Sequence, residues 1–310
     1  MLKDKTIILG VTGGIAAYKA ADLASKLAQA GATVRVVMTK AAREFIQPMT
    51  FEALTGYPVV TEMFGPEASS GITHINLADN ADIVLIAPAT ANVIAKIAGG
   101  IADDMLTCVV LATKAPVVVS PAMHNNMYIS PVTQENIEKL KKRGILTFTG
   151  MMLGLDEDTP EYFESVPKKL DEVDPSSVLF SISIPIPGTP FHKTVEAEGR
   201  LFDRDLSHYE GDHLVFWPRH VNPGQVFEAF RKINKYFYSW KNILKRWWRL
   251  ITKQSLKGNL LAKLFHTAII SVIFFKLSVF QRDHAQKRVY PMRTAEKEFS
   301  KRRESSALAA

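Results

Sequence analysis

Cysteine is almost absent from this sequence: Cys108 is the only one in 310 residues. A single cysteine excludes a disulfide within the chain, and it excludes any zinc or iron–sulfur site built from the chain's own thiolates. The first residues, Met1 to Lys5, contain no apolar signal core. We therefore expect a protein that stays in a reducing cytoplasm.

An acidic residue is missing where a dinucleotide site would need one. Residues 6–9 predict a strand, and Gly10-Val11-Thr12-Gly13-Gly14 predicts a tight turn into a helix over 15–30. Glycines there let a ligand phosphate reach bare backbone amides. An NAD site would place Asp or Glu after the second strand, residues 33–38, but Thr39 follows it. The pattern favours a mononucleotide phosphate, with a plain connecting turn as the alternative.

The charge is unevenly distributed along the chain. Hydrophobic residues make up 47% and charged residues 22%, which is typical of a soluble globular protein. Residues 1–150 carry 13 Lys and Arg against 12 Asp and Glu, whereas residues 151–310 carry 25 against 19. Almost all of the net charge of +7 therefore belongs to the second half.

Strands and helices are predicted to alternate as far as residue 150. Apolar runs such as Ile83 to Ala87 are typical of parallel strands buried on both faces. The predicted strands are 6–9, 33–38, 58–61, 83–87, 117–120 and 145–149, with helical stretches at 15–30, 41–45, 48–54, 93–98, 104–113 and 131–143 and a loop at 62–71. We expect an α/β fold, a doubly wound open parallel sheet of Rossmann-like type.

Three strand-to-helix turns should meet at the carboxyl edge of this sheet: Gly13-Gly14, Thr90-Ala91-Asn92 and Ala122-Met123-His124. The motifs around them are GVTGGIAAYKA, THINLADNADIVLIAPATANVIAKIAGGIADD and PAMHNNMY. With these motifs, residues 5–149 resemble the flavin-dependent cysteine decarboxylases, in particular the phosphopantothenoylcysteine decarboxylases of coenzyme A biosynthesis.

The resemblance implies a bound FMN and an oxidative decarboxylation. The thiol would be oxidised to a thioaldehyde, which gives the carboxylate an electron sink, and an ene-thiol would remain after carbon dioxide leaves. The residues at positions that match the family's cofactor site are Gly13, Gly14, Ile15, Thr39, Phe45, Thr90, Ala91, Asn92, Ala122 and Met123.

Two histidines are the catalytic candidates that the resemblance implies. His74, in a predicted loop, matches the active-site histidine that the family supplies from a neighbouring subunit of a trimer, so a homo-oligomer is expected. Read from the residues alone, it is equally a surface histidine. His124 stands where the family usually has an Asn that holds the substrate carboxylate. A histidine can also donate there, but it titrates.

The family also uses a cysteine in a flexible segment after the last strand to complete the reductive half-reaction. Cys108 lies in the predicted helix 104–113 instead, where it is expected to fill core space. We therefore expect turnover to stop at the oxidised product with reduced flavin, as in the lantibiotic-type cysteine decarboxylases.

The sequence changes character at Gly150. A helix to about Leu170, a strand over 178–184 and the string EGRLFDRDLSHYEGDHLVFWP resemble the last part of a cobalamin-binding radical S-adenosylmethionine barrel. That family needs three cysteines that this chain lacks, so no radical chemistry is expected. The predicted divisions are a flavoprotein domain, a partial barrel-like segment, a basic aromatic helical segment and a disordered tail, at 1–150, 151–225, 226–282 and 283–310.

Residues 231–263 contain ten Lys or Arg and no acid, with Tyr and Trp interleaved. One interpretation is a solvated basic face opposite an aromatic core stripe. The other is weak contact with a membrane surface through 231–280, whose apolar stretch 264–280 is short for a span. No nucleic-acid partner is predicted.

Three functions remain open at this point. The first is an FMN-dependent decarboxylase impaired in its reductive step, the second a non-catalytic flavin-binding or regulatory subunit, and the third a peripheral membrane protein dominated by its second half. A small-molecule cysteine carboxylate is the expected substrate of the first.

Overall fold

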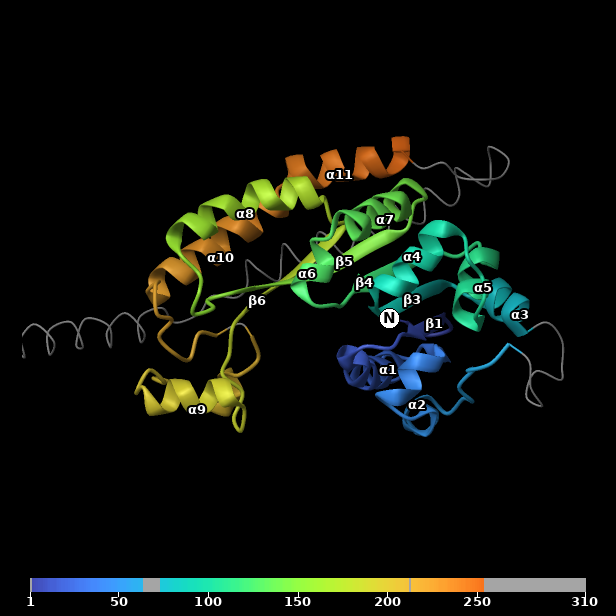
Figure 1. Cartoon of the computed structure of the whole chain (residues 1–310), viewed down its shortest axis with the longest axis horizontal. Helices are drawn as coiled ribbons and strands as arrows, with labels where there is room; N and C mark the ends of the chain where they lie inside the picture. The colour runs from blue at the N-terminus through green and yellow to red at the C-terminus, as the bar shows by residue number, and fades with distance from the viewer. Residues whose placement is uncertain (1, 64–72, 212, 254–310) are drawn as a thin grey trace, which may run out of the picture. The chain divides into compact units, whose positions relative to one another are not determined.

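The computed structural model describes residues 2–63, 73–211 and 213–253 (Figure 1). Within the described residues the chain divides into two compact units, with unit 1 formed by residues 2–149 and 248–253 and unit 2 by Gly150–Trp247. The apolar stretch predicted over 264–280, the predicted tail and most of the predicted loop 62–71 lie outside the described residues.

Unit 1 is built on a parallel sheet in the order β2-β1-β3-β4-β5. Its strands are β1 (Thr6–Val11), β2 (Thr33–Met38), β3 (Ile83–Ala89), β4 (Val117–Pro121) and the start of β5 (Leu146–Leu153). Its helices are η1 (Ile15–Tyr18), α1 (Lys19–Gln29), η2 (Lys40–Glu44), α2 (Pro48–Thr55), α3 (Thr73–Asn80), α4 (Ala91–Gly99), α5 (Met105–Ala112), α6 (Asn125–Tyr128) and α7 (Pro131–Lys142).

Helices cover both faces of this sheet because successive strand residues point to opposite sides. In β1, Ile8 belongs to a core with α3, α4, α5 and α7, whereas Leu9 belongs to a second core with α1 and α2. Both side chains are fully buried. Figure 1 shows α1 and α2 on one side of β1 and α4 and α5 on the other. The predicted doubly wound parallel sheet is confirmed.

Five local predictions for unit 1 were wrong, of which four concern the extent of strands and helices. The predicted strand 58–61 is reduced to one bridge, Val37 to Val60, because Pro58 cannot donate to a ladder. The helix predicted from Ile15 begins as the 3-10 turn η1. The turn after β4 contains the short helix α6, and β5 runs on to Leu153 rather than ending at residue 149.

His74 lies in the first turn of α3 rather than in a loop. Leu77 and Ala78 of this helix pack into the core, and this packing stabilises the helical conformation. Thr113 Oγ1 also donates to the carbonyl of Ala78 at 3.1 Å, which fixes the helix against the end of α5.

Unit 2 contains the end of β5 with β6 (Ser177–Ile182) and the helices α8 (Pro160–Val173), α9 (Pro190–Ala197), η4 (Leu206–His208) and α10 (Pro223–Phe237), together with α11 (Trp240–Lys253) as far as Trp247. Its core joins β6 to α8 and α10 through Phe180, Leu170 and Phe237. Tyr238 is 1% exposed, and its hydroxyl bonds both backbone groups of Val178. The likeness of this part to a radical S-adenosylmethionine barrel stays a prediction.

Candidate functional site

The carboxyl ends of β1, β3 and β4 meet at one edge of the unit 1 sheet because the three strands are parallel. Thr12, directly after β1, is fully buried there. Its hydroxyl donates to the carbonyl of Pro88 at 2.7 Å and accepts from the backbone N–H of Thr90 at 3.0 Å. One side chain therefore fastens the glycine turn to the turn after β3.

Gly13, the first residue of the Gly13-Gly14 pair, has no room for a side chain. A Cβ on Gly13 would lie 2.4 Å from the Cβ of Ala41, and 2.7–2.8 Å from that residue's backbone C and O. A Cβ on Gly14 would meet only Thr90 Cγ2, at 3.5 Å. The turn therefore packs against η2 on one side and the β3–α4 turn on the other.

Thr39 follows β2 at the same edge and carries an unsatisfied buried hydroxyl. Its backbone N–H donates to the carbonyl of Val11 at 3.1 Å, which ties this turn to the end of β1. The residue is 9% exposed, and among the described residues its Oγ1 has no hydrogen-bond partner. Such a group costs roughly 1–3 kcal/mol, which a polar ligand atom would offset.

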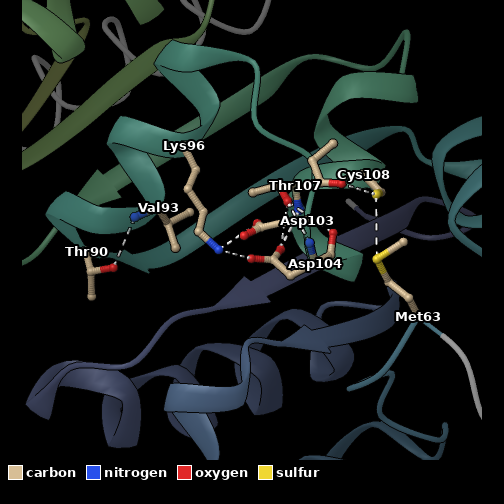
Figure 2. A network of polar contacts seen from close by, with 9 residues as sticks. Met63, Thr90, Val93, Lys96, Asp103, Asp104, Thr107 and Cys108 are labelled. Carbon is tan, nitrogen blue, oxygen red and sulfur yellow. Dashed lines mark hydrogen bonds and ion pairs between the residues drawn. The ribbon is translucent and has the colours of Figure 1, made fainter.

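The turn after β3 leads directly into α4. Thr90 is the N-cap residue, and its Oγ1 accepts from the backbone N–H of Val93 at 3.5 Å (Figure 2). Ala91 and Asn92 form the first turn of the helix, and Asn92 is exposed. Residues 90–92 therefore line the same edge as the glycine turn, with the positive end of the α4 dipole close by.

The turn after β4 joins the edge through a backbone bond, since the N–H of Ala122 donates to the carbonyl of Ala89 at 3.0 Å. Met123 packs against the core. His124 is exposed and caps α6, with its Nδ1 accepting from the backbone N–H of Asn126 at 3.2 Å. In the neutral ring this bond leaves the proton on Nε2, which can donate to a ligand.

Two apolar side chains predicted to lie beside the cofactor are exposed: Ile15 by 78% and Phe45 by 47%. His74, by contrast, is half-buried on α3. Within the part of the chain that the structure describes, no hydrogen bond joins His74 to the three turns. The structure thus brings the predicted turns together but does not add His74 to them within one chain.

Lys96 of α4 forms ion pairs with two acidic residues that precede α5. Sequence reasoning did not predict this cluster of charges. The Nζ atom of Lys96 lies 2.7 Å from Asp103 Oδ1 and 3.0 Å from Asp104 Oδ2 (Figure 2). Burial alone would raise the pKa of Asp104, but hydrogen bonds from the Thr107 backbone and from Lys96 hold that pKa below its usual value. The paired acids before α5 were the available signal, since Asp104 forms a capping box with Thr107.

Cys108 is half-buried on α5, where its Sγ contacts the carbonyl of Ala102 at 3.3 Å and Met63 Sδ at 4.0 Å (Figure 2). Burial raises the pKa of its thiol, and the nearby Asp104 and Asp103 raise it further. The protonated thiol is a poor nucleophile and a poor reductant.

Thr12 is the second residue that sequence reasoning missed. The only local signal was a hydroxyl between a buried strand and a pair of glycines, and its partners Pro88 and Thr90 are 76 and 78 residues away along the chain.

Comparisons with known proteins agree with the unit 1 fold. The sequence model of a family described as Flavoprotein matches residues 1–171. The chain is 54% identical over 144 residues to the coenzyme A biosynthesis bifunctional protein CoaBC of Vibrio vulnificus strain YJ016, and 51% identical over 144 residues to CoaBC of Bacillus subtilis strain 168. In both cases the match covers 46% of this chain and 36% of the relative, so the chain spans little more than a third of the length of these relatives.

Among solved structures, the FMN-dependent cysteine decarboxylase SpaF aligns with a TM-score of 0.45 and 35% sequence identity. The alignment covers 48% of this chain and 86% of SpaF.

Proposed function

The chain belongs to the flavoprotein family, and from that premise we propose that unit 1 is an FMN-dependent decarboxylase of phosphopantothenoylcysteine or a related cysteine carboxylate. The observation that carries the proposal is the sheet edge where Thr12 fastens two turns and the hydroxyl of Thr39 is buried without a partner. Support also comes from the 54% identity to a protein named for coenzyme A biosynthesis.

The edge fits a flavin mononucleotide in three respects. Gly14 has room around its Cα, where a Cβ would meet only Thr90 Cγ2 at 3.5 Å, so a phosphate can approach the turn closely. The buried hydroxyl of Thr39 needs a polar partner, and the exposed Ile15 and Phe45 offer apolar contact. The residues that would hold FMN are Gly13, Gly14, Ile15, Thr39, Phe45, Thr90, Ala91, Asn92, Ala122 and Met123. When bound, FMN would supply the oxidant for the substrate thiol.

His124 would bind the substrate carboxylate by donating from Nε2. Its Nδ1 accepts from the backbone N–H of Asn126, which limits rotation of the ring.

His74 would take up or direct the substrate proton, and a second copy of the chain would bring it to the edge. Large apolar side chains of unit 1 are exposed, as an oligomer interface requires. These are Ile15, Met49, Leu111, Ile129 and Val132. We therefore include a homo-oligomer, a trimer, in the proposal, to be measured by light scattering of the purified chain.

The reaction would end at the ene-thiol. The thiol of Cys108, the only cysteine, has a raised pKa and belongs to the packing of α5. It cannot return electrons to the product, so the carbon dioxide released and the flavin reduced should be equal in amount.

The test uses the full chain with added FMN and phosphopantothenoylcysteine, without oxygen. The proposal predicts a visible flavin spectrum that bleaches on adding substrate, with carbon dioxide and a product two hydrogens lighter than the aminothiol. A chain that takes up no FMN would overturn the whole proposal.

A non-catalytic flavin-binding subunit is the second candidate, favoured by the histidine at position 124 and by the unreactive environment of Cys108. A flavin spectrum that persists unchanged with substrate would establish this candidate over the decarboxylase.

A further inference from the structure

The two basic helices α10 and α11 differ in whether their apolar side chains are buried. In α10, Phe230, Ile233 and Phe237 are buried in the core, while Arg231, Lys232 and Lys235 are exposed. This agrees with the interpretation of a solvated basic face opposite an aromatic stripe. The helix needs no further partner to explain its composition.

Helix α11 presents apolar side chains to solvent. Ile243 is fully buried, but Trp240, Leu244 and Trp248 are exposed by 46%, 50% and 62%. These three residues are spaced by four, so they form one row along the helix. Exposure of two indoles and a leucine in one row is not expected of a helix that faces only water.

Basic residues accompany this row. Lys241 and Lys245 each follow a member of the row and are exposed. In the described part of the chain, neither lysine has an ion-pair partner, in contrast to Lys26, which pairs with Asp22 at 2.7 Å. No acid occurs anywhere between residues 231 and 263. The face therefore combines apolar side chains with uncompensated positive charge.

Arg246 is not part of this basic face, because its side chain attaches α11 to the end of α10. Its Nη2 donates to the carbonyl of Phe237 at 2.7 Å, and its guanidinium lies 3.7 Å from the centre of the Phe237 ring. Asn242 Nδ2 likewise donates to the carbonyl of Tyr236 at 2.7 Å. These contacts fix the start of α11 on the end of α10, which sets the orientation of the exposed row.

We propose that α11 lies on an anionic lipid surface, with Trp240, Leu244 and Trp248 in the interface and Lys241 and Lys245 at the headgroups. Indoles are favoured at the boundary between headgroups and acyl chains, leucine gains by leaving water, and lysine extends its charge towards anionic lipids. No described helix has the length and apolar character to cross a bilayer.

Nucleic acid is the competing partner for a basic helix. A strand of nucleotides would use the lysines and could stack on the indoles, but it offers nothing to an exposed leucine between them. The row is therefore matched better by acyl chains.

The experiment measures flotation of the purified full chain with vesicles of phosphatidylcholine, with or without about a third phosphatidylserine. Binding should require the anionic lipid and should weaken as salt rises from about 0.1 M to about 0.5 M, because screening shortens the reach of the lysine charges. Binding to neutral vesicles alone, or no binding, overturns the proposal.

Point variants assign the binding to α11. Lys241→Glu with Lys245→Glu should weaken anionic-vesicle binding by at least about tenfold, and Leu244→Asp should do so independently. Lys139→Glu with Lys193→Glu changes the same total charge at two exposed lysines of α7 and α9 and should leave binding nearly unchanged. Circular dichroism checks that each variant is folded.

Three results would contradict the assignment to α11. These are equal loss in the control variant, full binding in both α11 variants, and tighter binding of a labelled single-stranded oligonucleotide than of anionic vesicles. The proposal is independent of the decarboxylase, since none of these measurements involves FMN.

Discussion

Two polar sites, Arg200 in unit 2 and Thr39 in unit 1, differ in how their polar atoms are satisfied. In unit 2, Arg200 binds Asp156 through two hydrogen bonds of 2.7 and 2.8 Å and Glu198 through a third. In unit 1, the hydroxyl of Thr39 is buried at the sheet edge without a partner. Polar groups that satisfy one another stabilise a fold, whereas a group left unsatisfied beside glycines is suited to a ligand.

The largest expected effect comes from breaking the paired network of unit 2. Arg200→Leu should lower the free energy of unfolding of unit 2 by about 3 kcal/mol, because the largely buried Asp156 would lose both hydrogen bonds from Arg200 and keep only the longer one from Arg219. Urea unfolding followed by tryptophan fluorescence reports on this unit. The matched control Arg204→Leu removes an exposed pair with Glu196 and should cost less than about 1 kcal/mol. Equal costs for both would contradict the comparison.

The next largest effect comes from adding a Cβ at Gly13, where the turn contacts Ala41. Gly13→Ala should destabilise unit 1 by about 2 kcal/mol without FMN, because its Cβ would press on the backbone of Ala41. Gly14→Ala meets only an ordinary contact and should leave the midpoint of thermal unfolding nearly unchanged. A tolerated alanine at Gly13 would show that η2 does not hold the turn.

Removing the hydroxyl of Thr12 should cost about 1–2 kcal/mol of stability, since Pro88 and Thr90 would each keep a buried backbone group without its partner. Thr12→Val should therefore weaken both unit 1 and FMN binding, measured by chemical unfolding and by flavin titration. Thr12→Ser keeps the hydroxyl and should restore both. Failure of the serine variant would assign the effect to the lost methyl contacts instead.

Thr39→Val should change the stability of the chain without FMN and its affinity for FMN in opposite directions, which sharpens the comparison. The hydroxyl is unpaired in the chain alone, so stability without FMN should be unchanged or higher by up to about 1 kcal/mol. Affinity for FMN should fall by about five- to tenfold. A loss of stability without FMN would mean that the hydroxyl already has a structural role.

The smallest effect concerns pH. The pKa of Asp104 is lowered in the folded chain, so its contribution to stability is complete above its unfolded pKa of about 3.9 and is lost as pH falls through the lower folded pKa. Asp104→Asn should therefore reduce stability at neutral pH, and the difference from the original chain should shrink below about pH 4. Urea midpoints across this range measure it, and a constant difference would refute the ion pair.

Local signals in the sequence predicted much of the unit 1 fold. The strand over residues 33–38 was predicted to the residue, because its apolar run is bounded by Gly31 and by the polar Thr39 and Lys40. The start of α5 was predicted from its acids, and Asp104 is indeed its N-cap. The three turns at the carboxyl edge followed from the parallel alternation alone.

Features that depend on distant residues could not be predicted in this way. The helix around His74 forms because Leu77 and Ala78 pack into the core, which local propensity does not reveal. The Thr12 bonds span more than 70 residues, and the pair of Arg200 and Asp156 spans 44. The cap that His124 gives to α6 is uncommon for histidine, so no local pattern indicated it.

The central claim is that the carboxyl edge of unit 1 holds FMN, and titration of FMN into the purified full chain tests it most directly. The account predicts saturable binding of one FMN per chain, with lower affinity in Thr39→Val than in the original chain. Absence of saturable binding, or an affinity of Thr39→Val equal to that of the original chain, would contradict it.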